Sequence, residues 1–137
     1  MNLTLSVLPG RYAICRLAAE AAVPGWAGSA QVGPLAPGAC GFVSVTRTSE
    51  ELSIVCPEPV VPAAVRCDLG WRCLKIEGPL DLSLTGVLAS VLAPLAEARV
   101  NIFAVSTFDT DYLLVKDERV SLAVETLVRA GHRLEPS

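Results

Sequence analysis

The sequence predicts an α+β protein, and three observations support this fold class. Apolar residues make up 52% of the 137 residues, which is enough for a hydrophobic core and excludes global disorder. Short runs of alternating apolar and polar residues, typical of strands, recur along the chain. Two segments of the second half carry apolar residues at helical spacing. The length suits one compact domain or two very small units.

The first half of the chain predicts four strands, at Leu3–Leu8, Tyr12–Leu17, Phe42–Thr46 and Leu52–Val55. Because Pro9 and Gly10 form a turn, the first two strands are expected to pair as a hairpin or to form one long bent strand. The third and fourth strands are expected to form a hairpin around residues 47–51.

Proline and glycine dominate the segments between and after these strands. Residues 24–41 lack helical periodicity and predict a loop, with at most one helical turn near residues 18–22. Pro62 is expected to lie in the first turn of a short helix over residues 63–67.

The second half predicts six elements in the order strand, helix, strand, strand, helix, strand, at residues 72–76, 84–98, 101–107, 111–116, 120–128 and 132–134. Pro94 is expected to kink the first helix, and Gly131 closes the second. This βαββαβ order is the ferredoxin-like plan.

An internal repeat predicts that the plan occurs twice. At an offset of 60 residues, six pairs match in kind: Val45/Val105, Thr46/Ser106, Glu51/Asp111, Leu52/Tyr112, Ile54/Leu114 and Val55/Val115. The expected architecture is two tandem ferredoxin-like units, residues 1–68 and 69–137, the first of them degenerate and without a proper first helix. Chance similarity of two hairpins is the alternative.

Composition and charge exclude several classes of function. The net charge of −3 and the 5% aromatic content disfavour nucleic acid as a partner, because phosphate binding and base stacking need basic and aromatic surfaces. The longest uncharged run, residues 21–46, contains three prolines and five glycines, so no membrane helix is expected there. The N-terminus has no basic region before an apolar run, and the expected location is therefore the cytoplasm.

Neither catalytic residues nor a cofactor nor a metal site is predicted. The five cysteines are odd in number and lack C-x-x-C spacing, so buried, reduced thiols are expected. The one histidine, His132, lies in the predicted last strand without a recognisable nucleophile motif, and it is expected to be a partly exposed strand residue. An enzyme would need a reactive Cys15 or Cys73.

Two polar segments suggest a site for a small molecule. In residues 78–86, Asp81 or Ser83 can cap the following helix, and Gly86 permits the close approach of another backbone. In residues 106–111, hydroxyls, an aromatic ring and two carboxylates crowd one turn. A helix start for a carboxylate and an acid for an amino group together fit an α-amino acid. The alternative is an ordinary polar turn beside a capped helix.

The chain resembles the ACT-domain family, in particular small bacterial proteins of two ACT-like units and, more distantly, the Castor arginine sensors and aspartate kinase regulatory domains. The resemblance lies in residues 8–17, 44–48, 52–56, 75–80, 85–89, 93–98 and 102–115. It implies a non-catalytic regulatory protein that binds an amino acid at an interface between ACT units.

Carried onto matching positions, the resemblance implies ligand contacts at Thr85, Gly86, Thr107, Phe108 and Asp111, and with the adjacent Ser83, Leu84 and Ser106 the predicted ligand-binding residues number eight. Backbone groups of Thr85 and Gly86 would meet the ligand, Thr107 and Phe108 would line the pocket, and Asp111 would hold the positive group. Without a dependable second acid for a guanidinium, arginine is not the expected ligand. A homodimer is expected to complete the site. The alternative is a ligand-free module for dimerisation or for docking on a protein target.

Overall fold

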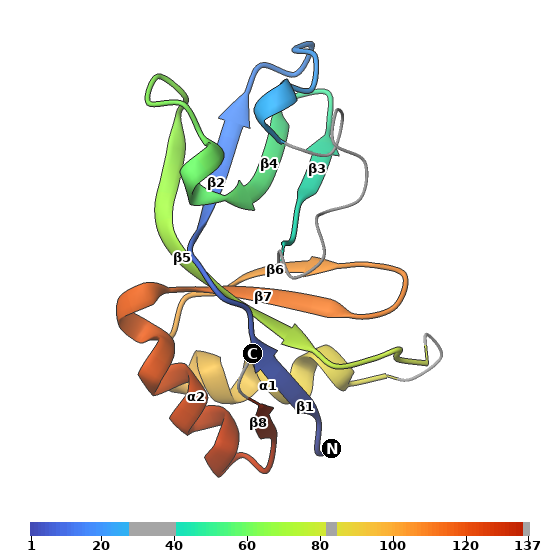
Figure 1. Cartoon of the computed structure of the whole chain (residues 1–137). Helices are drawn as coiled ribbons and strands as arrows, with labels where there is room; N and C mark the ends of the chain where they lie inside the picture. The colour runs from blue at the N-terminus through green and yellow to red at the C-terminus, as the bar shows by residue number, and fades with distance from the viewer. Residues whose placement is uncertain (28–40, 82–84, 136–137) are drawn as a thin grey trace. The chain divides into compact units, whose positions relative to one another are not determined.

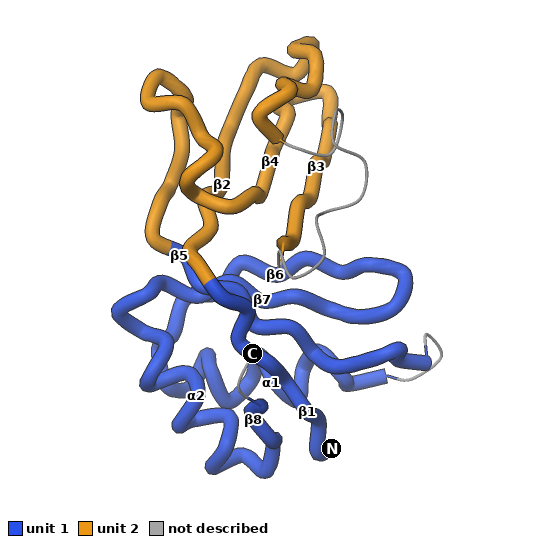
Figure 2. Tube along the Cα trace, viewed as in Figure 1, with its two compact units in different colours: residues 1–9, 71–137 blue, residues 10–70 orange. Residues whose placement is uncertain are grey.

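The computed structural model describes residues 1–27, 41–81 and 85–135, and these residues form an α+β structure (Figure 1). The chain divides into two compact units. Unit 1 contains residues 1–9 and 71–137, and unit 2 contains residues 10–70 (Figure 2). Residues 1–9, expected in the N-terminal unit, pack with the C-terminal half of the chain.

The sheet of unit 1 has the strand order β6-β7-β5-β1-β8. These strands are β1 (Thr4–Val7), β5 (Cys67–Ile76, which begins in unit 2), β6 (Phe103–Ser106), β7 (Asp111–Lys116) and β8 (Arg133–Glu135). All neighbours are antiparallel except β1 and β8.

Strand β1 separates the first and last strands of the βαββαβ plan. Its Leu5 is fully buried opposite Ile76 of β5 and Leu134 of β8. The predicted hairpin between this strand and residues 12–17 is therefore wrong. Strand β1 lies between β5 and β8 and pairs with a strand along each edge. In a two-stranded hairpin, each strand has a partner along one edge only.

Helices α1 (Val87–Glu97) and α2 (Val120–Arg129) lie together on one face of this sheet (Figure 1). Their apolar stripes pack on the strands to form the core of unit 1: Leu5, Leu74, Ile76, Val91, Leu95, Val100, Leu113, Val115, Ala123 and Leu127. Helix α1 begins three residues later than predicted. Gly86, the residue before the helix, has a φ of 78°. This left-handed conformation is not that of a right-handed helix, so α1 begins after Gly86.

His132 is buried, with 4% of its surface exposed, so the expectation of a partly exposed residue is wrong. Its Nδ1 accepts the N–H of Leu3 at 3.0 Å, which leaves the proton on Nε2, and Nε2 lies 2.9 Å from the carbonyl oxygen of Ser90. In a regular helix that carbonyl would accept the N–H of residue 94. Because Pro94 has no N–H, His132 supplies the missing donor.

Unit 2 has the strand order β3-β4-β2-β5. Its own strands are β2 (Tyr12–Leu17), β3 (Ser44–Arg47) and β4 (Leu52–Pro57), and its core comprises Ala13, Cys15, Ala27, Leu52, Ile54 and Cys56. The hairpin of β3 and β4 is confirmed. The helices of its described part are two single 3₁₀ turns, η1 (Gly25–Ala27) and η2 (Glu58–Val60).

The predicted helix over residues 63–67 is wrong, because Pro62 begins only a turn, in which its carbonyl accepts the N–H of Val65 at 3.2 Å. Residues 61–66 between η2 and β5 are too few for a counterpart of α2. Unit 2 is therefore degenerate at its second helix. The place of its first helix overlaps residues 28–40, which lie outside the described residues.

The internal repeat is real, but its offset is 59 residues. Strand β3 begins at residue 44 and β6 at 103, β4 at 52 and β7 at 111, and η2 at 58 and η3 (Asp117–Arg119) at 117. The predicted offset of 60 is wrong by one residue. In a strand, an error of one residue matches positions whose side chains face opposite sides of the sheet.

Candidate functional site

The two predicted polar segments meet at one pocket of unit 1. The pocket has a volume of about 110 Å³ and is lined by Leu80, Asp81, Val87, Thr107, Asp109, Thr110 and Asp111. These residues come from the loop after β5, the first residue of α1 and the turn between β6 and β7. Segments more than twenty residues apart in the sequence therefore share one cavity.

The β6–β7 turn is held by a closed set of hydrogen bonds. The backbone N–H of Thr107 donates to the carbonyl of Thr110 at 2.8 Å, and the Thr107 hydroxyl accepts the N–H of Thr110 at 3.3 Å. The Ser106 hydroxyl donates to the carboxylate of Asp111. These bonds fix the direction of Asp111 at the start of β7.

The loop after β5 is docked tightly on this turn. The N–H of Leu80 donates to the carbonyl of Asp109 at 2.7 Å, and the buried Thr110 hydroxyl donates to the carbonyl of Ile76. A Cβ on Gly78 would lie 3.0 Å from the Asp109 oxygen and 3.2 Å from Cβ of Thr110. A side chain at this position would therefore push the two segments apart.

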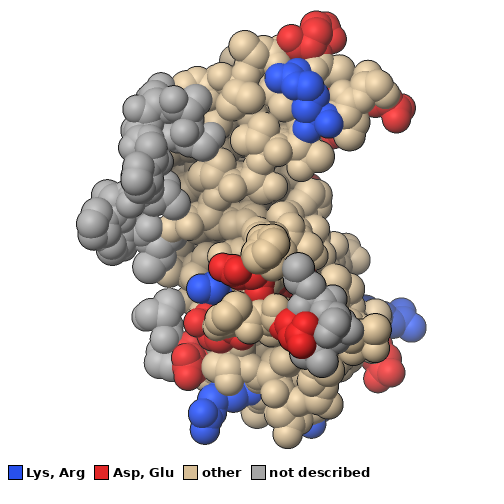
Figure 3. Space-filling model, turned by 90° about the vertical axis from the view of Figure 1, so that its right-hand side faces the viewer, with Lys and Arg blue, Asp and Glu red and all other residues tan. Residues whose placement is uncertain are grey.

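The pocket is acidic. Its lining residues include Asp81, Asp109 and Asp111, and no Lys or Arg is among those that the structure describes there. Figure 3 shows Asp and Glu side chains gathered on this face of unit 1. The expectation of no dependable second acid stays a prediction, but two further acidic residues, Asp81 and Asp109, line the same pocket as Asp111. Such an arrangement attracts an ammonium group and repels an anionic side chain.

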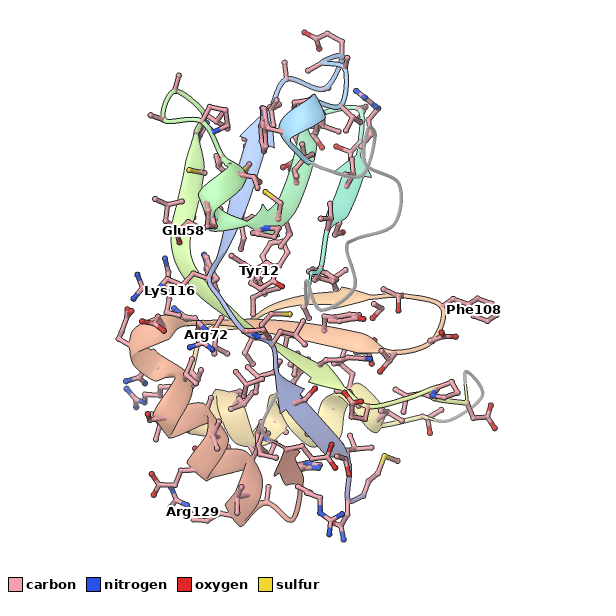
Figure 4. The ribbon with its side chains drawn as sticks, viewed as in Figure 1. Tyr12, Glu58, Arg72, Phe108, Lys116 and Arg129 are labelled. Atoms are coloured by element: carbon pink, nitrogen blue, oxygen red, sulfur yellow. The ribbon has the colours of Figure 1, made fainter. Side chains whose placement is uncertain are left out.

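The eight predicted site residues have different positions. Thr107 and Asp111 line the pocket, and Ser106 contacts the carboxylate of Asp111. Thr85 and Gly86 are exposed before α1 and are not part of the lining, and Ser83 and Leu84 lie outside the described residues. Phe108 is 82% exposed at the tip of the hairpin and points away from the pocket (Figure 4).

The predicted ligand-binding residues did not include Gly78 or five of the residues that line the pocket: Leu80, Asp81, Val87, Asp109 and Thr110. The T-x-x-T spacing of Thr107 and Thr110 is the signal that indicates a hydroxyl-closed turn. Within the described part of the chain, a Cβ on Gly86 would meet no atom within 4 Å, so the close approach expected there is not made by these residues. Gly86 is needed for its backbone conformation, and Gly78 makes the close approach.

Cys15 and Cys73, the cysteines that an enzyme would need, are both buried. Burial raises the pKa of Cys73 to about 12, and burial also raises the pKa of Cys15, so thiolates are scarce at both positions near neutral pH. Within residues 1–27, 41–81 and 85–135, no group of three acidic, histidine or cysteine side chains is arranged to hold a metal ion. The helices of the same residues are too short to span a bilayer.

Comparison with family models assigns both parts of the chain. Residues 66–129 match the ACT domain model, and residues 10–64 match a model that describes an N-terminal domain. The solved structure of protein Atu0741 from Agrobacterium tumefaciens is 42% identical, with a TM-score of 0.88, and the match covers 100% of this chain and 95% of that one.

Regulatory proteins are among the other relatives. The bovine (Bos taurus) cytosolic arginine sensor for mTORC1 subunit 1 is 30% identical over 101 residues, and the human (Homo sapiens) protein is 28% identical. These matches cover 66% of this chain but only 31% of either sensor, so the chain spans about a third of their length. The regulatory subunit of aspartate kinase from Thermus thermophilus shares the fold, at 16% identity and a TM-score of 0.59 over 95% of this chain and 99% of that one.

Proposed function

On the premise that this chain belongs to the ACT-domain family, we propose that it is a non-catalytic regulatory protein that binds a small amino acid between ACT units. The observation that carries the proposal is the acidic pocket of unit 1, at which the β6–β7 turn meets the loop before α1. Asp111 would hold the ammonium group of the ligand, with Asp81 and Asp109 adding negative potential. N–H groups at the start of α1 would bind its carboxylate.

Pocket size supports a small side chain. A volume of about 110 Å³ is well below the roughly 300–1,000 Å³ of sites for drug-sized ligands. Such a cavity fits an amino acid with a short, uncharged side chain better than arginine, although the three carboxylates would suit a guanidinium. Aspartate and glutamate are disfavoured because their side chains would face like charge.

A second copy of the chain would complete the site. At the repeat offset of 59, Leu52 stands where unit 1 has Asp111, and Arg47 stands where it has Ser106. Leu52 is fully buried, and Arg47 donates to the carbonyl of Ala21 at 2.7 Å. Unit 2 therefore lacks the acid–hydroxyl pair, and two copies of unit 1 from two chains are the proposed partners. A cytoplasmic location, as in the cytosolic sensor, belongs to the same proposal.

The alternative function is a ligand-free module for dimerisation or for docking on another protein. The exposed phenyl ring of Phe108 favours it, because a large aromatic side chain in solvent suits a contact surface. In the two-chain model, the same ring would line the pocket of the partner.

Thermal unfolding with a panel of small amino acids tests the proposal. Binding at 100 times Kd adds about 2.7 kcal/mol to the free energy of unfolding and raises Tm. Glycine, alanine, serine and threonine are expected to include a ligand, whereas aspartate, glutamate and the matched amides without an α-carboxylate are not. Unchanged Tm with all twenty amino acids at millimolar concentration would favour the interaction module.

A further inference from the structure

Three cysteines of unit 2 lie in a row on one face of its sheet. Cys15 is on β2, Cys56 on β4 and Cys67 at the start of β5, and β2 lies between the other two strands. The neighbouring thiols of Cys56 and Cys67 both affect the pKa of Cys15. All three belong to or pack against the same core cluster. The central thiol therefore has two possible partners for a disulfide.

Strand register distinguishes the two partners. On the β4 side, Cys15 is opposite Ile54 and Cys56 is opposite Ala13, so the two cysteines are diagonal neighbours, about 7–8 Å apart at Cα. On the β5 side, the N–H of Arg16 donates to the carbonyl of Arg66 at 3.0 Å, and the strands run in opposite directions (Figure 1).

The Arg16–Arg66 bond places Cys15 directly opposite Cys67, at the next pair without backbone hydrogen bonds. Directly opposed residues of such pairs have Cα atoms about 4.5 Å apart, within the range of about 4.4–6.8 Å that a disulfide spans. The diagonal pair lies outside that range.

Access also differs among these thiols. Cys15 is 1% exposed and Cys56 is fully buried. Cys67 is half-buried and borders a pocket of about 350 Å³ whose other lining residues are Glu58, Pro59, Val61, Pro62, Ala63 and Leu69. A small oxidant that enters this pocket reaches Cys67 first.

We propose that Cys67 and Cys15 form a reversible cross-strand disulfide, with Cys67 as the attacking thiol and Cys15 as the resolving thiol. With a low-molecular-weight disulfide such as oxidised glutathione, the Cys67 thiolate attacks one sulfur and expels one glutathione thiolate. Cys15 then loses its proton, attacks the Cys67 sulfur and expels the second. Two protein thiols are oxidised, and one glutathione disulfide is reduced to two thiols.

The second step is expected to be the slow one. Burial raises the pKa of Cys15, so its thiolate fraction, and with it the rate of ring closure, increases as the pH rises from 7 to 9. The bond would join β2 to β5 and restrict the unfolded chain between residues 15 and 67. A higher Tm after oxidation, reversed by dithiothreitol, is the expected consequence.

Peptide mapping tests the proposal on the folded full-length chain. Oxidised glutathione is added, exchange is quenched with acid, free thiols are blocked with N-ethylmaleimide at mildly acidic pH, and the chain is digested with trypsin. Each cysteine falls on its own tryptic peptide, and Cys15 and Cys67 fall on residues 12–16 and 67–72. The expected product is these two peptides joined, two hydrogens lighter than their sum and separated by dithiothreitol.

Matched variants make the result decisive. Cys67→Ser should abolish the linked peptide, whereas Cys56→Ser and Cys40→Ser should retain it, and circular dichroism checks that each variant is folded. A wild-type bond between Cys15 and Cys56 would overturn the proposal. So would glutathione that stays on Cys67 without ring closure, or a linked peptide that forms only in guanidinium.

Discussion

Asp111 is the pocket carboxylate whose direction is fixed by the fold, since the Ser106 hydroxyl donates to it at the start of β7. Replacing it with Asn removes the charge but keeps an oxygen that Ser106 can reach. If the carboxylate binds the ammonium group of the ligand, Asp111→Asn loses roughly 1.5–3 kcal/mol and weakens binding about 10- to 150-fold. Isothermal titration calorimetry with the amino acid from the thermal screen measures this change.

Glu118→Gln is the matched control, because it removes one exposed carboxylate of unit 1 that is not part of the pocket. Its affinity should equal that of the parent chain. If Asp111→Asn and the parent bind with equal affinity, this carboxylate stabilises the turn and does not bind the ligand. Only the stability of the variant would then change.

Two glycines near the pocket are required for different physical reasons. Gly78 has little space for a Cβ, since Asp109 O and Thr110 Cβ lie at 3.0 and 3.2 Å from its ideal position. Gly86 has open space but a φ of 78°. Gly78→Ala is expected to cost about 1–3 kcal/mol through overpacking, and Gly86→Ala about 1–2 kcal/mol through backbone strain.

Urea unfolding of the two alanine variants and of Gly86→Asn separates the causes. Asparagine tolerates the left-handed conformation, so Gly86→Asn should be more stable than Gly86→Ala. Gly78→Ala should also weaken ligand binding, because it displaces the turn that carries Asp111. A Gly78→Ala variant with parental stability and affinity would show that the loop and the turn move apart without loss of stability or binding.

At the scale of elements, Pro94 and His132 form a compensating pair between α1 and the start of β8. Pro94 leaves the carbonyl of Ser90 without its helical donor, and His132 Nε2 lies 2.9 Å from that oxygen. His132→Phe keeps an aromatic ring at this position but leaves this carbonyl and the Leu3 N–H unpaired. The expected loss is about 2–4 kcal/mol in the free energy of unfolding.

A double-mutant cycle with Pro94→Ala tests the pairing. Alanine restores an N–H that can donate to Ser90, so His132→Phe should cost about 1 kcal/mol less in the Pro94→Ala background than in the parent. Urea denaturation of the four chains measures the coupling. Strictly additive losses would mean that the histidine does not replace the missing helical donor.

At the scale of the whole molecule, the proposed site predicts a dimer built from unit 1 of two chains. The exposed Phe108 ring would then be covered by the partner, so Phe108→Ser should shift the equilibrium toward monomer and weaken ligand binding as well. Sedimentation equilibrium at tens of micromolar, with and without the amino acid, measures both effects. Val128→Ser is the control, because it removes another exposed apolar side chain, on α2, away from the hairpin.

A chain that stays monomeric while it binds the amino acid stoichiometrically would contradict the shared site. The pocket would then have to be completed within one chain. A dimer that forms without ligand and binds none would support the interaction module.

The sequence by itself was sufficient for the α+β fold class, the resemblance to the ACT-domain family and most elements. Strands β2 and β7 have their predicted bounds, because alternation and turn residues are local signals. The same local chemistry marked residues 78–86 and 106–111, the two segments that meet at the pocket. Apolar periodicity likewise predicted both helices of unit 1.

Tertiary structure alone decided which distant segments are neighbours. Partners far away in the sequence determine the pairing of β1 with β5 and β8 and the burial of His132. The same holds for the offset of 59 in the repeat. Gly78 and Gly86 are both glycines with polar neighbours, and only the packed structure distinguishes the one that needs space from the one that needs a positive φ. Local propensity acts over a few residues, whereas register and burial are determined by long-range packing, which a single sequence does not display.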